Sequence, residues 1–211
     1  VGAKLVSSLS KTAYLKTSIG LSTNTNEYLQ DNYNRDLNEE VINKYRATEV
    51  NSTENRYTLS SVLNKKFNAR FNLRSGTTIE VFQLDALTLD RDRRVEIPDN
   101  NGDQIPDNFF TFRDIDEFLT LSQFFSQGEY KFTDEISLTV GIHAQYLDLT
   151  DDLAFEPRAA ISWQFKPKQR LSLAYGMHSQ MAPLPVLFLT ERNLDGEDVR
   201  TNDELEFTKS Q

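Results

Sequence analysis

Apolar and polar side chains alternate along several stretches of this chain. Between Ile136 and Tyr146 every even position is apolar, and every odd position is polar or glycine. A period of two residues is that of a β-strand with one apolar face, so the pattern predicts a strand. The same alternation returns at 159–165 and 171–177, and only Lys166–Gln169 connect these two stretches. Such a short connection predicts a hairpin.

The complete pattern predicts an all-β chain of about eight strands. Short connections are sufficient for antiparallel hairpins but not for parallel crossovers, so we expect an antiparallel, up-and-down sheet. Near Val81 the apolar positions change from odd to even, which predicts a β-bulge. The segment Asn38–Glu49 also fits a short helix, as an alternative to an irregular loop. The expected strands are 3–9, 12–23, 55–64, 70–89, 116–130, 136–150, 155–165 and 170–179.

The connections between these strands are mostly short and long in alternation. The long ones, 24–54, 90–117 and 180–206, together hold 23 acidic and 9 basic residues. This net charge of −14 within a chain of net charge −9 leaves +5 elsewhere, partly in the short turns. Transmembrane barrels of outer membranes show the same asymmetry, with short turns on the periplasmic side and longer loops outside.

Strand length and side-chain chemistry also favour a transmembrane barrel. A strand over 70–89 would extend about 66 Å, whereas a sandwich strand usually has about 3 to 10 residues. The polar positions of 136–146 carry no acidic or basic side chain, which suits a lumen better than the wet face of a soluble sheet. We expect Ile136, Leu138, Val140, Ile142 and Tyr146 to face lipid, and Ser137, Thr139, His143 and Gln145 to face the lumen.

Aromatic side chains gather beside two of the short turns. Trp163 and Phe165 precede one turn, Tyr130 and Phe132 flank the start of another, and Tyr146 lies at the opposite strand end. Barrels carry aromatic girdles at both membrane interfaces, so these residues predict such girdles. The alternative interpretation is that they are ordinary core aromatics.

Composition excludes several classes of protein. The chain has no Cys, which excludes disulfides, thiolate zinc sites and a cysteine nucleophile. Its net charge of −9 argues against a nucleic-acid partner, because binding to phosphates comes from clustered Lys and Arg. No motif combines a nucleophile, a base and an oxyanion donor, so we expect no enzymatic activity.

One loop has the spacing of a cation site. Asp99, Asn101, Asp103 and Asp107 place oxygen ligands at the first, third, fifth and ninth positions of a tight loop, an arrangement that suits Ca²⁺. Gln104 occupies the position at which such loops place glycine, and no Glu occupies the twelfth position. The spacing predicts a calcium site, and the alternative is a polar loop tip.

The last third of the chain resembles a known family. The run FEPRAAISWQF at Phe155–Phe165, followed by QRLSLAYGMHSQMAPL at Gln169–Leu184, resembles the late barrel of TonB-dependent outer-membrane receptors of the Bacteroidetes type. The run LEFTKSQ at Leu205–Gln211 resembles the strand that follows in that family. The resemblance covers residues 154–211.

This resemblance implies a barrel of about 22 strands with a plugged lumen. It further implies a location in the cell outer membrane and uptake of a scarce solute with energy from the TonB complex. The implied partners are outer-membrane lipid, the TonB complex through a plug domain, and a small solute or oligomer. We expect residues 1–211 to form one partial barrel domain, with the plug domain and the remaining strands outside this chain. A partial barrel has open strand edges, so we expect it to associate in water.

Two other classes of protein fit parts of the pattern. A self-contained small outer-membrane or ligand-binding β-barrel would need its first and last strands to pair. A secreted carbohydrate-binding β-sandwich would need two sheets with opposed apolar faces. The pairing of the strands in the structure therefore tests both alternatives.

Overall fold

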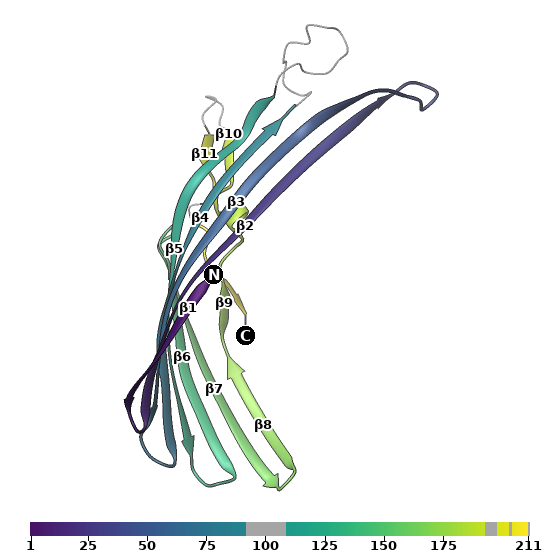
Figure 1. Ribbon diagram of the computed structural model, residues 1–211. Coiled ribbons are helices and arrows are strands. Elements are labelled where there is room, and N and C mark those ends of the chain that lie inside the picture. Colours follow the sequence, from purple (N-terminus) through teal and green to yellow (C-terminus); the bar gives the residue numbers. More distant parts are fainter. Residues whose placement is uncertain (92–108, 193–197, 203, 211) are drawn as a thin grey trace. The chain divides into compact units, whose positions relative to one another are not determined.

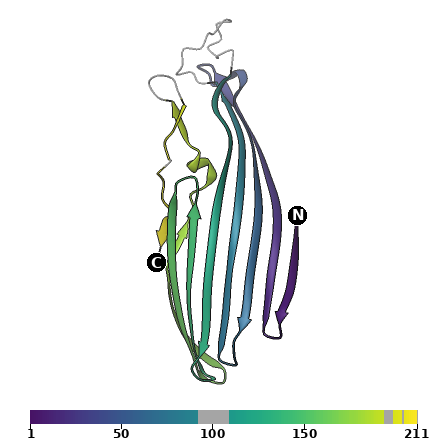
Figure 2. The same ribbon diagram turned by 90° about the vertical axis from the view of Figure 1, so that its left-hand side faces the viewer.

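A computed structural model confirms the all-β prediction. The structure describes residues 1–91, 109–192, 198–202 and 204–210. In this part of the chain, eight strands form one sheet in which consecutive strands are neighbours (Figure 1, Figure 2). These strands are β1 (Gly2–Ser10), β2 (Ala13–Arg35), β3 (Val41–Lys66), β4 (Phe71–Asp90), β5 (Phe110–Lys131), β6 (Ile136–Leu147), β7 (Asp152–Lys166) and β8 (Gln169–Gly176).

The strand pairs predicted from short connections are antiparallel. β7 pairs with β8 across the turn at Lys166–Gln169, and β5 pairs with β6. The pairs β1–β2 and β6–β7 are antiparallel as well. With neighbours in sequence order, this pairing is the expected up-and-down topology.

Short elements follow β8. They are β9 (His178–Gln180), α1 (Leu184–Leu187), β10 (Thr190–Arg192), β11 (Asp198–Arg200) and β12 (Thr208–Ser210). β10 pairs with β11, and β12 pairs with β9, both antiparallel. Leu184, Leu187 and Phe188 of this segment are buried.

The chain divides into two compact units. Unit 1 comprises 1–22, 56–82 and 119–211, and unit 2 comprises 23–55 and 83–118. The four short turns, which follow β1, β3, β5 and β7, all belong to unit 1, and Figure 1 shows them at the same end of its strands. We call this end the turn edge.

Side chains of the turns themselves specify two of these reversals. The Oδ1 of Asn68 accepts hydrogen bonds from the backbone N–H groups of Arg70 (2.8 Å) and Phe71 (2.9 Å). The Oγ1 of Thr133 likewise accepts from the N–H groups of Glu135 (3.1 Å) and Ile136 (3.0 Å). Asn and Thr favour turns because their side chains replace a backbone acceptor in this way.

The prediction of a long loop at 24–54 is wrong, and so is the helical alternative at 38–49. Unit 2 contains the second half of β2 and the first part of β3, which leave only a short turn between Arg35 and Val41. In that turn Asp36 Oδ1 accepts the N–H of Glu40 (2.9 Å), and Glu39 has a φ of 65°.

Polar pairs across the two strands explain this extended hairpin. Thr23 donates to Asn55 (2.8 Å), and Asp31 forms ion pairs with Lys44 (3.0 Å) and Arg46. Cross-strand pairs stabilise a sheet without any apolar alternation. The usual sequence signal of a strand is therefore missing from this segment.

The apolar positions change from odd to even near Val81, but the buried side chains of β4 stay on one face of the strand. Its buried side chains, Glu80, Phe82, Leu84 and Ala86, all occupy even positions. The apolar pattern changes because the even face turns from polar to apolar along the strand. A bulge is not needed to explain the sequence.

Candidate functional site

The strands β5 to β8 of unit 1 have two chemically different faces. Val140 lies opposite Ala159, and Ala159 opposite Tyr175, so these three side chains share one face of the pleated sheet. We call it the apolar face. Val140 is 52% exposed and Leu173 is 73% exposed. Its large exposed side chains include Val140, Ile142, Ile161, Trp163, Leu171 and Leu173.

The opposite face, which we call the polar wall, carries His143 and Gln145. His143 lies opposite Phe125 on one side and Glu156 on the other, and Gln145 is buried. The predicted division of β6 into an apolar and a polar side is therefore confirmed. The exposed side is the apolar one, the reverse of a soluble sheet.

A continuous hydrogen-bonded belt crosses the polar wall. Glu80 Oε1 accepts from Arg56 Nε (2.8 Å), and Glu80 Oε2 accepts from Gln123 Nε2 (3.0 Å). His143 Nε2 lies 3.3 Å from Gln123 Oε1, and its Nδ1 lies 3.0 Å from Glu156 Oε2. Both ring nitrogens therefore face side-chain oxygens. The belt thus links side chains of five consecutive strands, from β3 to β7.

Glu156 is the most highly connected residue of this belt, and it is only 2% exposed. Its Oε1 accepts from the backbone N–H of Ser179 (2.9 Å) and from Gln145 Nε2 (3.0 Å). Its Oε2 faces His143 and accepts from Arg158. Because donors occupy both oxygens, Glu156 anchors neighbouring segments and is not free to act as a base.

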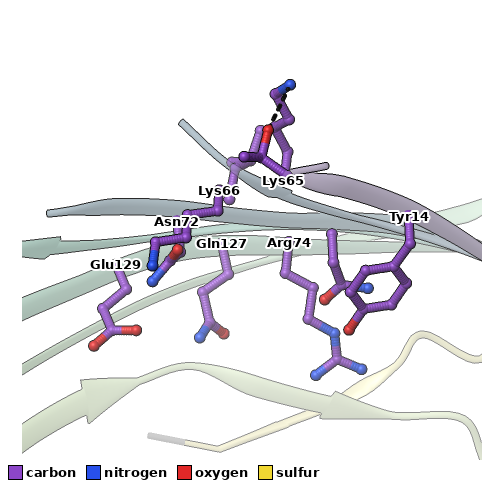
Figure 3. A pocket seen from close by; sticks show the side chains of 10 residues that line it. Tyr14, Lys65, Lys66, Asn72, Arg74, Gln127 and Glu129 are labelled. Atoms are coloured by element: carbon purple, nitrogen blue, oxygen red, sulfur yellow. Dashed lines mark hydrogen bonds between the residues drawn. The ribbon is translucent and has the colours of Figure 1, made fainter. Parts of the chain in front are cut away.

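A hollow of about 350 Å³ lies on the same wall near the turn edge. Figure 3 shows Tyr14, Arg74, Gln127 and Glu129 projecting from one side of the sheet. The guanidinium of Arg74 lies 5.4 Å from the ring centre of Phe125, a cation–π contact that orients it. The other lining residues are Thr12, Asn64, Lys65, Lys66, Asn72 and Leu73.

A second hollow, of about 590 Å³, lies further along the wall. Gly141, Ala160, Ala174 and Gly176 contribute to its lining together with Arg158. Small side chains leave space above the sheet, and the wall is therefore recessed at this point.

Aromatic pairs flank three of the four turns. In each pair the rings are in contact and at least one is well exposed, as the predicted girdle requires. The ring centres are 5.3 Å apart in Phe67–Phe71, 5.1 Å in Tyr130–Phe132 and 5.6 Å in Trp163–Phe165.

The predicted calcium ligands Asp99, Asn101, Asp103 and Asp107 lie outside the described residues, so that site stays a prediction. Among the residues that are described, no group of three or more His, Asp or Glu side chains is placed to hold a metal ion. No helix in this part of the chain is long and apolar enough to cross a membrane.

Sequence reasoning placed His143 and Gln145 on the polar side but missed Glu156, Glu80 and Gln123. A signal was present in β7, where the even positions from Glu156 to Gln164 include the polar residues and the odd positions are apolar or proline. The partners themselves depend on strand register, which the alternation does not give.

Comparison with solved structures shows a similar fold in a transporter. A structure of the RagAB peptide transporter superposes with a TM-score of 0.58 at 11% sequence identity, covering 99% of this chain and 26% of that chain. A mutant of the ferric enterobactin receptor (PfeA) from Pseudomonas aeruginosa gives a TM-score of 0.41 at 14% identity, covering 98% of this chain and 38% of that one. This chain therefore spans about a quarter of the length of the first.

No curated protein matches the chain. A family model described as "TonB dependent receptor-like, beta-barrel" matches residues 6–201. This family comprises receptors and transporters, not enzymes. The match spans nearly the whole sequence, and the eight-stranded up-and-down sheet agrees with it. The chain belongs to the TonB-dependent receptor β-barrel family.

Proposed function

We propose that this chain forms part of the barrel wall of a receptor in the cell outer membrane. The apolar face meets lipid, and the polar wall lines the passage of a solute. The receptor takes up this solute with energy from the TonB complex. The barrel segment corresponds to residues 1–211. A plug domain outside this segment makes the contact with the TonB complex.

The observation that carries this proposal is the inverted distribution of polarity across one sheet. Val140 and Leu173 are more than half exposed on one face, whereas Glu156 and Gln145 are buried on the other. Open apolar faces of this extent are unfavourable in water and mark contact with lipid or protein. A polar interior with a lipid-facing apolar exterior is the arrangement of an outer-membrane barrel.

The spacing of the aromatic residues supports the same placement. From Ile136 to Tyr146 the strand rises about 33 Å at ~3.3 Å per residue. With a tilt of about 40°, this corresponds to an apolar band about 25 Å tall. The aromatic pairs by the turns and Tyr146 would then lie at the two interfaces of the bilayer.

The alternative functions lose support from strand pairing. Within the described residues the eight long strands belong to one sheet, which does not provide the two opposed sheets of a carbohydrate-binding sandwich. In the same residues β1 and β8 are the two edges of that sheet and do not pair with each other. A self-contained barrel of these eight strands would require that pairing.

Spin labels in the full-length receptor test the placement directly. Residues 1–211 contain no native Cys, so Val140→Cys and Thr139→Cys each introduce one labelling site into this segment, on opposite faces. In a bilayer, the label at 140 should respond to oxygen and the label at 139 to a water-soluble nickel chelate. The opposite responses would reject the assignment of the faces.

Uptake experiments test the transport part of the proposal. A strain that depends on this receptor for its scarce solute should lose uptake when the TonB complex is removed. Uptake that persists without the TonB complex would refute the energised mechanism, while leaving the membrane placement intact.

A further inference from the structure

Basic residues are unevenly distributed over the short turns of the turn edge. Residues Lys65–Arg70, after β3, and Lys166–Arg170, after β7, each hold three basic residues and no acidic one. The turn after β5, Lys131–Glu135, holds one basic and two acidic residues. We call the turns after β3 and β7 the cationic turns. Their basic residues are Lys65, Lys66, Arg70, Lys166, Lys168 and Arg170.

The charges of the cationic turns are open to their surroundings. Five of the six basic side chains are exposed, and that of Lys65 is half-buried. In the part of the chain that the structure describes, none of the six is in an ion pair with a carboxylate. Grouped like charges are unfavourable unless an anion compensates them. The two turns therefore suit an anionic partner.

The side chain of Lys65 lies on the side of the sheet opposite the polar wall. Figure 3 shows it projecting away from the side to which Tyr14 and Arg74 point. Its Nζ lies 5.9 Å from the ring centre of Phe67 and donates to Thr12 Oγ1 (3.3 Å). Phe67 is 55% exposed. These contacts hold a positive charge beside an exposed aromatic ring, on the side that the proposed function assigns to lipid.

The turn that presents this charge is ordered by its own side chains. Asn68 Oδ1 accepts from the backbone N–H groups of Arg70 and Phe71, and the rings of Phe67 and Phe71 are stacked. Arg70 is exposed in this turn. A preordered turn loses little conformational entropy when a ligand binds to it.

The turn after β7 repeats the combination of aromatic and basic side chains. Trp163 and Phe165 have exposed rings in contact with each other, and they immediately precede Lys166 and Lys168. Trp163 belongs to the apolar face, since it lies opposite Ile136. Each cationic turn therefore places exposed basic groups next to exposed aromatic rings.

We propose that the cationic turns bind the headgroups of acidic phospholipids in the leaflet that meets the turn edge. Aromatic rings favour the level of the headgroups, and the phosphate oxygens accept charge-assisted hydrogen bonds from Lys and Arg. Basic residues beside a membrane attract acidic lipids in this way. A zwitterionic headgroup carries a cation of its own, which the cationic turns repel. The inference rests on the membrane placement in the proposed function and adds the class of lipid.

Spin-labelled lipids measure this preference. The full-length receptor is reconstituted in phosphatidylcholine vesicles with a small amount of phosphatidylglycerol or phosphatidylcholine labelled on an acyl chain. Contact with the receptor slows the label, so the slowed fraction gives the relative affinity of the two lipids. Phosphatidylglycerol should be preferred about threefold or more, and added sodium chloride should reduce this preference. Sodium phosphate at the same ionic strength should reduce it no further, which distinguishes a lipid site from a site for free phosphate.

Charge variants locate the preference in the turns. Replacement of Lys65, Arg70 and Lys168 together by Gln should at least halve the preference for phosphatidylglycerol. The double variant Asp134→Asn with Glu135→Gln removes negative charge from the turn after β5 and should raise the preference. Melting temperatures equal to that of the wild type would show that these variants remain folded.

A matched control removes three cations from the polar wall. Tyr14 and Arg74 project from that side (Figure 3), and Lys16, two residues after Tyr14 in β2, shares it. Lys16 pairs with Val6, and Lys4, two residues before Val6 in β1, points the same way. Replacement of Lys4, Lys16 and Arg74 together by Gln should leave the lipid preference unchanged, because these side chains do not face lipid.

Three outcomes would overturn the inference while leaving the membrane placement intact. These are equal slowing of both labelled lipids by the wild type, an unchanged preference in the variant of the cationic turns, and an equal loss in the control from the polar wall. If neither lipid is slowed, the receptor does not meet lipid, and the proposed placement fails together with this inference.

Discussion

The carboxylate of Glu156 accepts hydrogen bonds from both the backbone N–H (2.9 Å) and the hydroxyl (2.5 Å) of Ser179. Ser179 belongs to β9, just after the chain leaves its pairing with β7. The backbone hydrogen bond that follows this pairing runs from the N–H of Met177 to the carbonyl oxygen of Pro157 (3.1 Å). The side chain of Glu156 therefore continues the connection to β7 after the backbone pairing has ended.

Removal of the charge at Glu156 should destabilise unit 1. Glu156→Gln leaves Arg158 without its carboxylate and weakens the contacts with Ser179 and His143. Loss of a buried, charge-assisted acceptor costs roughly 2 to 3 kcal/mol. Urea unfolding of the full-length receptor in lipid measures this loss. Glu135→Gln, in an exposed turn, is the matched control, and an equal effect in both variants would contradict the role of Glu156.

A cation on the apolar face should be costly only in a bilayer. Val140→Arg should lower the free energy of unfolding by roughly 2 to 4 kcal/mol, the cost of Arg near the bilayer midplane. Thr139→Arg introduces the same side chain on the polar wall and should be tolerated better. Unfolding titrations in phospholipid vesicles compare the two variants. A larger loss for Thr139→Arg would mean that the two faces are exchanged.

Steric space distinguishes two glycines of the sheet. A Cβ at Gly76 would lie 2.8 Å from both Phe125 Cε1 and the backbone oxygen of Ser61, whereas a Cβ at Gly20 would lie 3.8 Å from Thr58. Gly76→Ala should therefore cost roughly 1 to 3 kcal/mol through overpacking, and Gly20→Ala should be nearly neutral. Thermal or urea unfolding of both variants is the measurement. Equal stabilities would show that the sheet shifts to accept the methyl group.

The ion pairs of the β2–β3 hairpin should respond to acid. Arg46 and then Lys44 lower the pKa of Asp31 below its ordinary value. A membrane crossing takes about 9 to 11 residues, so Asp31, near the far end of the 23-residue β2, lies outside the crossing segment. Because the folded-state pKa is lowered, this stabilisation is complete above the ordinary pKa and is lost as the pH falls through the lowered value.

Hydrogen exchange provides the measurement for this prediction. Backbone amides of the hairpin near Asp31 should exchange faster, relative to intrinsic rates, at about pH 2.5 than at about pH 5. The variant Asp31→Asn should lack this difference. If wild type and variant change alike with pH, another group is responsible.

Calcium binding by the loop at 99–107 is a separate prediction. If Asp99, Asn101, Asp103 and Asp107 are ligands, titration of the full-length receptor with Ca²⁺ should release heat at millimolar concentration or below, the range of extracellular calcium modules. Asp103→Asn should abolish this heat. The absence of heat in the wild type would support the interpretation as a polar loop tip.

Local alternation was sufficient to predict the part of the sheet that belongs to unit 1. In β6 the even positions are apolar and the odd ones polar, and this contrast is visible in the sequence because each face has one uniform environment. The turn residues Asn68 and Thr133 are likewise local signals. Strands, hairpins and their facing could therefore be derived from neighbouring residues alone.

The part of the β2–β3 hairpin that lies in unit 2, and the belt, could not be derived in this way. Between Thr23 and Asn55 polar residues predominate, and the apolar ones, among them Leu29, Val41 and Ile42, do not alternate with them, so no period of two marks these strands. The partners of Glu156 come from β6, from β7 and from the segment after β8, and the order of these groups in space depends on the register of several strands. Alternation constrains the side of a residue but not its neighbour across the sheet.

The sequence by itself determined that this protein is an antiparallel β-sheet with one apolar and one polar face. Alternate residues of a strand point to opposite faces, so the polarity of each face can be read from neighbouring residues of that strand. Only the tertiary structure decided that Arg56, Glu80, Gln123, His143 and Glu156 form one belt, and that Arg74 and Lys66 share a hollow with Tyr14. These groups lie far apart in the chain, and the pairing of strands, which is a property of the whole sheet, brings them together.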